Sequence, residues 1–186
     1  MIGYAICASF CTHKSSLKIL EDLRERGEEL IPIISEKSAL CDTRFGKASD
    51  LIRRAEEICG RRAVLDIVEA EKFGAQNPLE YLIISPCTGN TLAKLSAGIT
   101  DGAVTMAAKA HLRCDRPLLI ALATNDAMSQ NLKNIGTLLS RKSVYFVPMK
   151  QDDPKGKPHS LVCDAEKIIE AFSAMKKGEQ IRPLFL

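Results

Sequence analysis

One stretch of the sequence, from Leu82 to Lys94, most constrains what the chain can fold into. An apolar run, Leu82–Ile84, leads into the small and hydroxyl-bearing residues of Ser85–Thr91, and a segment with the composition of a helix follows. Such a junction is typical of a parallel β-sheet, whose carboxyl edge carries the loop. The next helix directs unpaired backbone N–H groups at any anion there. The stretch therefore predicts a phosphate site, with a simple helix cap at Ser85 or Thr88 as the alternative.

Apolar segments of strand length alternate with segments of helical period along the whole chain. This alternation predicts an α/β fold, in which one domain of residues 1–186 has a mostly parallel sheet with helices on both faces. The predicted strands are Gly3–Ala8, Leu30–Ile34, Ala63–Ile67, Tyr81–Ser85, Leu118–Ala123 and Val144–Val147. The predicted helices are Ser15–Gly27, Ala48–Cys59, Thr91–Ala97, Ala103–Arg113, Ala127–Ser140 and Ala165–Lys176.

The composition excludes several classes of protein. The chain has 186 residues, of which 46% are hydrophobic, enough to bury a core without disulfides or metal. A net charge of +3 and 5% aromatic residues argue against nucleic-acid binding. The seven scattered cysteines lack C-x-x-C pairs and predict reduced thiols and no metal site. Without an apolar run of about 20 residues or a leader, the chain is expected to be cytoplasmic, away from membranes.

The segment Lys150–His159 is charged and is interrupted by Pro154, Gly156 and Pro158. This composition predicts a mobile surface loop at residues 150–160. Two interpretations are open for it, a lid over a binding site and a solvated connection before the last helix.

Four of the predicted strands are followed by residues rich in hydroxyl and amide groups. Ligands of open parallel sheets bind outside the carboxyl ends of the strands, so we expect these four loops to converge. Their lining suits a neutral ring system with one phosphate, such as FMN, better than a metal ion or a pair of carboxylates. The four loops are Ser9–Ser16, Ser35–Ser38, Ser85–Thr91 and Thr124–Asp126.

The chain resembles the flavin-dependent cysteine decarboxylase-like flavoproteins over nearly its whole length. The central loop, Ser85-Pro86-Cys87-Thr88-Gly89-Asn90-Thr91-Leu92-Ala93-Lys94, is similar to the family's P-A-S-A-N-T-x-A-K, and Gly98-Ile99-Thr100-Asp101 follows it. The resemblance implies a Rossmann-like flavoprotein fold, bound FMN and a homo-oligomer, either a trimer or a dodecamer. The cofactor-binding residues that it implies are Ser9, Phe10, Thr12, Ser35, Ser85, Pro86, Cys87, Thr88, Gly89, Asn90, Thr91, Thr124 and Asn125.

Two departures from the family pattern bear on the expected reaction. The decarboxylases of the family use a histidine between the second strand and the central loop, whereas this chain has none between His13 and His111. Their P-x-M-N-x-x-M motif corresponds to Leu122–Met128, which keeps Asn125 and the final methionine but lacks the proline and the first methionine. Cysteine decarboxylation is therefore not the expected activity.

Two further segments, Ile6–Thr12 and Gly102–Arg113, resemble a branch of this family that forms pyridine-2,6-dicarboxylate in sporulating bacteria. The resemblance implies an oxidoreductase subunit in the mother cell, which works with a separate subunit that binds NADP or NAD. The sequence has no G-x-G-x-x-G fingerprint, as expected if a partner carries the nicotinamide. The alternatives are an FMN-dependent decarboxylase of a cysteine-containing compound and a non-catalytic, flavin-binding regulatory subunit.

A dicarboxylate substrate requires cations in its pocket. The candidates are Arg44, Lys47, Lys109 and Arg113, with charges that merely keep the surface soluble as the alternative. His13 lies between a strand and a helix, where it is a candidate for contacting phosphate or carrying a proton near neutral pH. The predicted catalytic residues are accordingly His13, Arg44 and Lys109.

Overall fold

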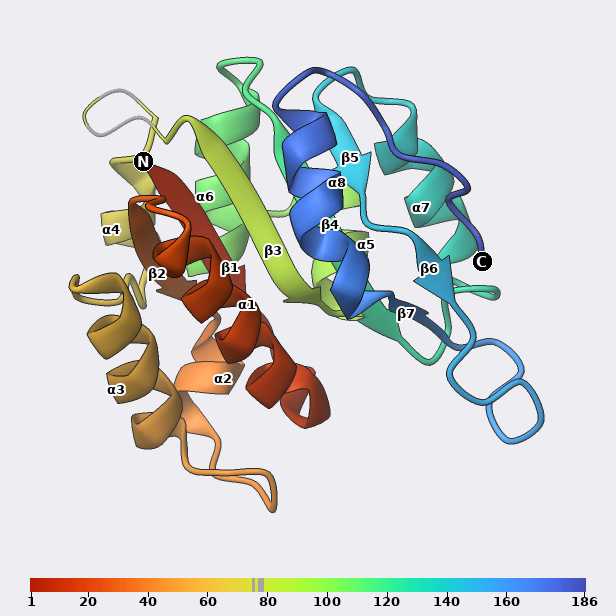
Figure 1. Ribbon diagram of the computed structural model, residues 1–186, viewed down its shortest axis with the longest axis horizontal. Helices are drawn as coiled ribbons and strands as arrows, with labels where there is room; N and C mark the ends of the chain where they lie inside the picture. Colours follow the sequence, from red (N-terminus) through yellow and green to blue (C-terminus); the bar gives the residue numbers. More distant parts are fainter. Residues whose placement is uncertain (75, 77–78) are drawn as a thin grey trace.

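In the part of the chain that the structure describes, residues 1–74, 76 and 79–186, a seven-stranded sheet lies between two layers of helices (Figure 1). The structure is a computed structural model. The strand order is β2-β1-β3-β4-β7-β6. Strand β5 lies outside this order and pairs with β4. Strands β1 to β5 pair in parallel, whereas β6 and β7 pair antiparallel. The strands are β1 (Ile2–Ile6), β2 (Leu30–Ile34), β3 (Tyr81–Cys87), β4 (Leu118–Thr124), β5 (Val144–Phe146), β6 (Met149–Lys150) and β7 (Leu161–Cys163).

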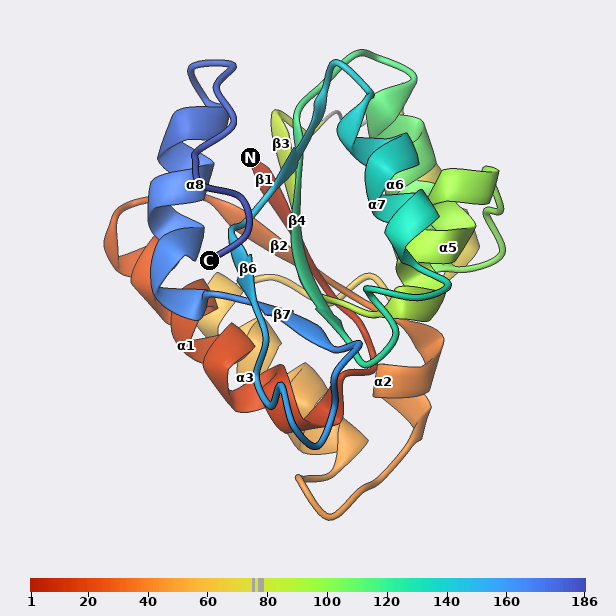
Figure 2. The same cartoon turned by 90° about the vertical axis from the view of Figure 1, so that its right-hand side faces the viewer.

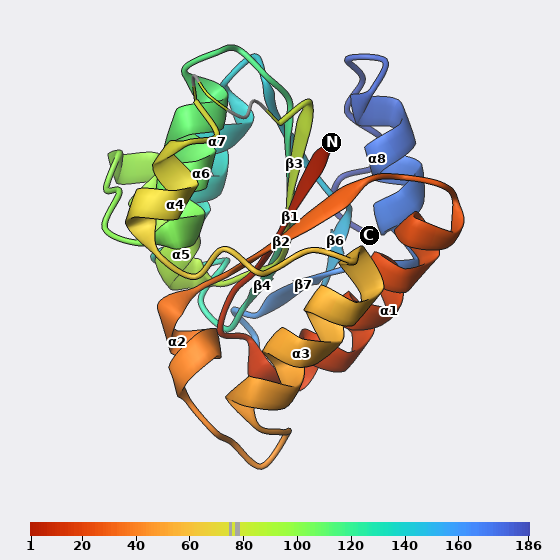
Figure 3. The same ribbon diagram turned by 90° about the vertical axis from the view of Figure 1, so that its left-hand side faces the viewer.

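The helices divide between the two faces of the sheet, as Figure 2 and Figure 3 show. On one face lie α1 (His13–Glu25), α3 (Ala48–Cys59) and α8 (Ile168–Met175). On the other face lie α4 (Ile67–Glu71), α5 (Gly89–Ala97), α6 (Ala103–Leu112) and α7 (Leu132–Leu139). A short helix, α2 (Glu36–Leu40), follows β2, and the 3₁₀ turns η1 (Phe10–Thr12) and η2 (Ala165–Lys167) precede α1 and α8.

The continuous burial of β1 and β3 follows from their inner positions in the sheet. All five residues of β1 are buried, and six of the seven residues of β3 are, because helices cover them from both sides. Strands buried on both faces read as continuous apolar runs, as in parallel sheets generally. The hydroxyl of Tyr4 donates a hydrogen bond to the carbonyl oxygen of Ser16 at 2.9 Å and so ties α1 to β1. The α/β fold with helices on both faces is therefore confirmed.

One predicted strand, Ala63–Ile67, is wrong. Only Val64 forms a bridge there, to Ile33, and the chain then turns into α4. The cause is Asp66, whose carboxylate accepts hydrogen bonds from the backbone N–H groups of Val68 and Glu69, both at 2.9 Å. This is an N-cap, which starts a helix where the apolar run alone indicated a strand.

The predicted helix Ala127–Ser140 begins later than expected, at Leu132. Asp126 holds the preceding residues in a turn, because its carbonyl oxygen accepts hydrogen bonds from the N–H groups of Ser129 and Asn131. The short elements α2, β6 and β7 were not predicted, since two to five residues carry little periodic signal. None of the helices in the described residues combines the length and apolarity needed to span a membrane.

Candidate functional site

The carboxyl ends of β1, β3 and β4 surround a cavity of about 450 Å³, here called the central cavity. Residues after each of these strands line it, as expected for the edge of a parallel sheet. Seven predicted cofactor-binding residues are among them: Ser9, Thr12, Thr88, Gly89, Asn90, Thr124 and Asn125. The structure therefore brings three of the four predicted loops together at one place.

A second cavity of about 240 Å³, here called the side cavity, adjoins the central cavity. Ser35, at the end of β2, lines it together with Thr91. Thr88 and Asn90 line both cavities, so the start of α5 forms a wall that the two share. The fourth predicted loop thus reaches the same site from the other side of this wall.

The start of α5 is fixed by hydrogen bonds among its own residues and to β1. Thr88 caps the helix, because its hydroxyl oxygen accepts a hydrogen bond from the backbone N–H of Thr91 at 3.2 Å. The Thr91 hydroxyl donates to the sulfur of Cys7 at 3.4 Å. Burial raises the pKa of the Cys7 thiol to about 11, so it remains protonated. Both cavities therefore share a rigid wall that carries the positive end of a helix dipole.

Gly89 lies against a cluster of polar groups that leaves no room for a side chain. A Cβ atom at this position would lie 2.6 Å from the amide nitrogen of Asn131 and 2.8 Å from a carboxylate oxygen of Asp126. Asp126 accepts hydrogen bonds from the Thr124 hydroxyl and, at 2.9 Å on each oxygen, from Asn131. The Thr124 hydrogen bond is the main cause that lowers the pKa of Asp126. Both carboxylate oxygens are thus engaged within the protein.

Three residues of the segment 151–160 line the central cavity, namely Asp152, Lys157 and Ser160. The Ser160 hydroxyl donates to Asp152 at 2.7 Å, and Lys157 forms an ion pair with the same carboxylate at 3.1 Å. The backbone N–H of Met128 donates to the carbonyl oxygen of His159 at 3.0 Å. The sequence placed Asp126 in one of the four converging loops, although not among the predicted cofactor-binding residues. Asp152, Lys157 and Ser160 were not predicted as residues of the site, and only the fold brings them to it.

Three predicted cofactor-binding residues, Ser85, Pro86 and Cys87, belong to β3 and act on the site indirectly. Ser85 is 3% exposed and Cys87 is fully buried, and burial raises the pKa of the Cys87 thiol well above its usual value. The Ser16 hydroxyl donates to the Ser85 carbonyl oxygen, and the Cys7 N–H donates to that of Pro86 at 3.1 Å. The backbone of these residues therefore fixes the loop that carries Thr88.

The three predicted catalytic residues do not line a common cavity. His13 and the predicted cofactor residue Phe10 line a cavity between α1 and α3. Arg44 lies on an exposed turn, with its guanidinium 4.8 Å from the centre of the Phe45 ring. Lys109 lines a hollow beside α5 and α6 with Arg113. The catalytic roles of all three stay predictions.

His13 is held in one protonation state. Its Nε2 donates a hydrogen bond to the carbonyl oxygen of Cys7 at 2.9 Å, and its ring contacts that of Phe10 edge to face at 5.3 Å. Burial lowers the pKa of His13. The side chain is therefore neutral at pH 7, with Nε2 protonated and Nδ1 as its acceptor.

The donors around the two cavities fit a flavin mononucleotide. The side chains of Ser9, Asn90 and Asn125 are neutral donors, which suit phosphate and sugar oxygens, whereas the Thr12 hydroxyl donates to the Ser9 carbonyl oxygen at 2.8 Å and keeps its acceptor lone pairs for a ligand. The first turn of α5 adds backbone N–H groups and the dipole of a nine-residue helix. Asp126 keeps its negative charge at this cavity, and both of its oxygens already accept hydrogen bonds within the protein.

A parallel sheet whose carboxyl edge carries neutral donors around the start of a helix is typical of nucleotide-binding α/β proteins, and this chain has that arrangement. The chain belongs to the Flavoprotein family, whose sequence profile matches residues 2–181. It is 34% identical over 185 residues to the B subunit of dipicolinate synthase from Bacillus subtilis (strain 168), with 100% of this chain and 92% of that protein covered.

Solved structures resemble the chain over a similar extent. A crystal structure of the dipicolinate synthase B subunit from Bacillus halodurans C superposes with a TM-score of 0.91 at 36% identity, covering 100% of this chain and 95% of that one. The FMN-dependent cysteine decarboxylase SpaF superposes with a TM-score of 0.71 at 21% identity, covering 95% of both chains. This second likeness shows the shared fold.

Proposed function

We propose that this chain is the B-type subunit of a dipicolinate synthase, which forms pyridine-2,6-dicarboxylate from a dihydrodipicolinate-type precursor. The observation that carries the proposal is the full-length similarity to the B subunit of that enzyme, at 34% identity. The reaction removes a hydride and a proton from the precursor ring. The hydride reduces NADP or NAD on a partner A subunit, and the proton passes to solvent. The complex works in the cytoplasm of the mother cell during sporulation.

FMN is the proposed cofactor of this chain, and when bound it supplies a carrier that accepts and releases a hydride. Ser9, Thr12, Asn90 and the first turn of α5 would hold it, with Ser35 reaching it from the side cavity. Gly89 allows the central loop to approach the Thr124–Asn131 cluster closely. The residues of the chain would bind the flavin, orient it and shield it from water.

Residues 151–160 are proposed to exclude water from the central cavity. Asp152 and Lys157 line the cavity and hold each other at 3.1 Å, so this segment covers its outer side. We propose that the segment moves when a ligand enters, which would make it the lid considered from the sequence.

The partner subunit and the homo-oligomer belong to the same proposal. The chain has no G-x-G-x-x-G fingerprint, so a second subunit must bring the nicotinamide. The A subunit of dipicolinate synthase is the proposed partner, and a trimer or dodecamer of this chain is the proposed assembly.

Reconstitution tests this function. The chain, its partner and the dihydro precursor are mixed with NADP or NAD, and reduced nicotinamide and pyridine-2,6-dicarboxylate are measured together. We expect one nicotinamide reduced per dicarboxylate formed, and little product when this chain is omitted. Full-rate synthesis by the partner alone would contradict the proposal.

A flavin titration completes the test of the cofactor. We expect the absorption of FMN to change on addition of the chain and the melting temperature to rise with FMN concentration. Activity of the complex without any flavin would remove FMN from the proposal. Release of carbon dioxide from a cysteine-containing compound would instead favour the decarboxylase alternative.

A further inference from the structure

A cavity of about 430 Å³ lies between α1, α3 and the residues that connect α2 to α3, and the proposed flavin site leaves it without a role. We call it the outer cavity. Figure 3 shows α1 and α3 side by side, with the connection from α2 extending beyond them. Aromatic and charged side chains line it, chiefly Phe10, His13, Lys14, Phe45, Lys47 and Asp50.

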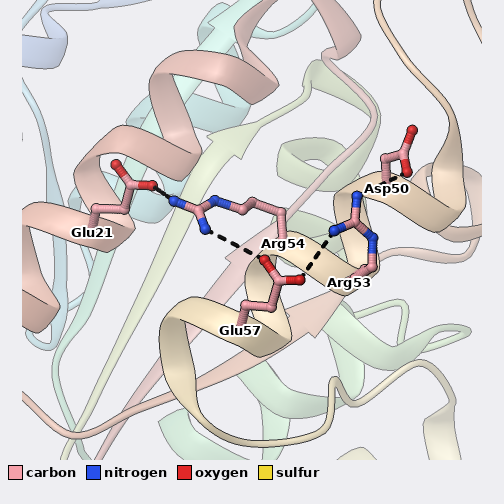
Figure 4. A network of polar contacts seen from close by, with 5 residues as sticks. All are labelled: Glu21, Asp50, Arg53, Arg54 and Glu57. Atoms are coloured by element: carbon pink, nitrogen blue, oxygen red, sulfur yellow. Dashed lines mark hydrogen bonds and ion pairs between the residues drawn. The ribbon is translucent and has the colours of Figure 1, made fainter.

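Two arginines of α3 at the edge of this cavity are already neutralised by acids. Arg53 pairs with Asp50 at 3.2 Å and with Glu57 at 3.0 Å. Arg54 pairs with Glu57 at 3.4 Å and with Glu21 of α1. Figure 4 shows the five side chains as one continuous network that joins the two helices. These arginines therefore shape the cavity but bring little free positive charge to it.

Lys14 and Lys47 differ from the arginines in this respect. Both line the outer cavity, and neither forms an ion pair within 4 Å with any residue that the structure describes. They come from different elements, since Lys14 belongs to α1 and Lys47 precedes α3. Two ammonium groups on separate elements around one cavity can provide separate partners for two carboxylates of one ligand.

The walls between the lysines are aromatic. Phe10 and His13 pair edge to face with ring centres 5.3 Å apart. The Phe45 ring is 54% exposed on its turn, and the Arg44 guanidinium covers one of its faces. Flat apolar surfaces of this kind bind planar rings by stacking and edge contacts.

A single 3₁₀ turn, η1, separates the outer cavity from the central cavity. Phe10 lines the former, whereas Thr12 of the same turn lines the latter. His13 donates to the carbonyl oxygen of Cys7, and the Cys7 sulfur in turn accepts from the hydroxyl of Thr91, which lines the side cavity. A ligand in the outer cavity would thus lie next to the flavin site.

We propose that the outer cavity binds a planar six-membered-ring dicarboxylate, with Lys14 and Lys47 each holding one carboxylate and Phe10 and Phe45 contacting the ring. Pyridine-2,6-dicarboxylate is of this class, so the inference rests on the proposed function and locates its substrate or product. Lys47 was a cation candidate from the sequence, whereas Lys14 emerges only from the fold.

Calorimetric titration of the full chain with pyridine-2,6-dicarboxylate tests the site. We expect saturable binding of one ligand per chain, and about tenfold weaker binding for each of the single variants Lys14→Ala and Lys47→Ala. Pyridine-2-carboxylate, which has one carboxylate fewer, should bind the wild-type chain about tenfold more weakly. The matched control is the double variant Lys133→Ala/Lys142→Ala, which removes two exposed lysines elsewhere and should bind normally.

The outcomes separate this inference from the proposed function. Absence of binding, or equal weakening in the control and in the Lys14→Ala/Lys47→Ala variant, overturns the site even if the reconstituted complex makes dicarboxylate. Binding that depends on both lysines supports the site even if the complex proves inactive, in which case the proposed function fails alone. Far-ultraviolet circular dichroism and melting temperatures establish that each variant is folded.

Discussion

At the scale of single residues, the candidate site depends on neutral groups in close contact. Thr88 could be predicted from the sequence as a helix cap, because a hydroxyl before a helix has a local signature. Its neighbour Cys87 was predicted in the site as well, but it is fully buried as the last residue of β3. Asp152 and Ser160 could not be predicted, because only the packing of residues 151–160 brings them to the cavity.

Gly89 offers the sharpest test at this scale. In a Gly89→Ala variant the new methyl group would meet Asn131 and Asp126 at less than 3 Å, so the loop must shift. We expect the free energy of unfolding to fall by about 1–3 kcal/mol and FMN binding to weaken at least about tenfold. Chemical denaturation and flavin titration measure the two effects.

Gly136 provides the matched control. It lies in α7, where a Cβ atom would have nothing within 4 Å. Gly136→Ala should therefore stabilise the protein by about 0.5–1 kcal/mol and leave flavin binding unchanged. If both variants bind flavin equally well, the close packing at Gly89 does not affect flavin binding.

At the scale of secondary structure elements, His111 joins α6 to the start of β4. Its Nε2 donates to the carbonyl oxygen of Pro117 at 2.7 Å, and its buried Nδ1 has no partner among the described residues. Burial lowers the pKa of His111 from 6.5 to about 4. As the pH falls below 6.5, the unfolded chain binds a proton that the folded chain does not, and stability is lost between pH 6.5 and about 4.

This pH dependence predicts the behaviour of His111→Gln, which keeps a donor for Pro117 but does not titrate. When the pH is lowered from 8 to 5, the free energy of unfolding should fall by about 2 kcal/mol more in the wild-type protein than in the variant. Urea denaturation of both proteins at the two pH values measures the difference. Equal losses in both would show that His111 titrates normally in the folded protein.

The elements themselves differ in how far the sequence predicts them. The helix Ala48–Cys59 was predicted with its observed ends, because its apolar stripe is long and Gly60 follows with a positive φ of 64°. Ala63–Ile67 was mistaken for a strand, because its four apolar residues outweighed the cap at Asp66. Long periodic patterns therefore identified the elements reliably, whereas single side-chain hydrogen bonds decided where several of them begin.

At the scale of the whole molecule, the fold sorts the seven cysteines by access. Cys11 and Cys114 are exposed, Cys41 and Cys163 are intermediate, and Cys7, Cys59 and Cys87 are buried. We expect two thiols of the native chain to react rapidly with a disulfide reagent, and all seven in denaturant.

Bound FMN should slow the reaction of only one of these two exposed thiols with the disulfide reagent. Cys11 lines the central cavity, so a bound flavin would cover it, while Cys114 follows α6 and serves as an internal control. Mass spectrometry of the labelled peptides distinguishes them. Equal protection of both, or of neither, would argue against flavin in the central cavity.

The wall that Thr88 and Asn90 form between the central and side cavities has an energetic consequence. Asn90 is exposed and its side chain makes no hydrogen bond to the described residues, so a group bound on one side restricts its rotamers, and a group on the other side then loses less conformational entropy on binding. The two halves of the site are then thermodynamically linked, and the linkage is reciprocal. A compound that fills the side cavity alone would raise the affinity of the central cavity for its own ligand.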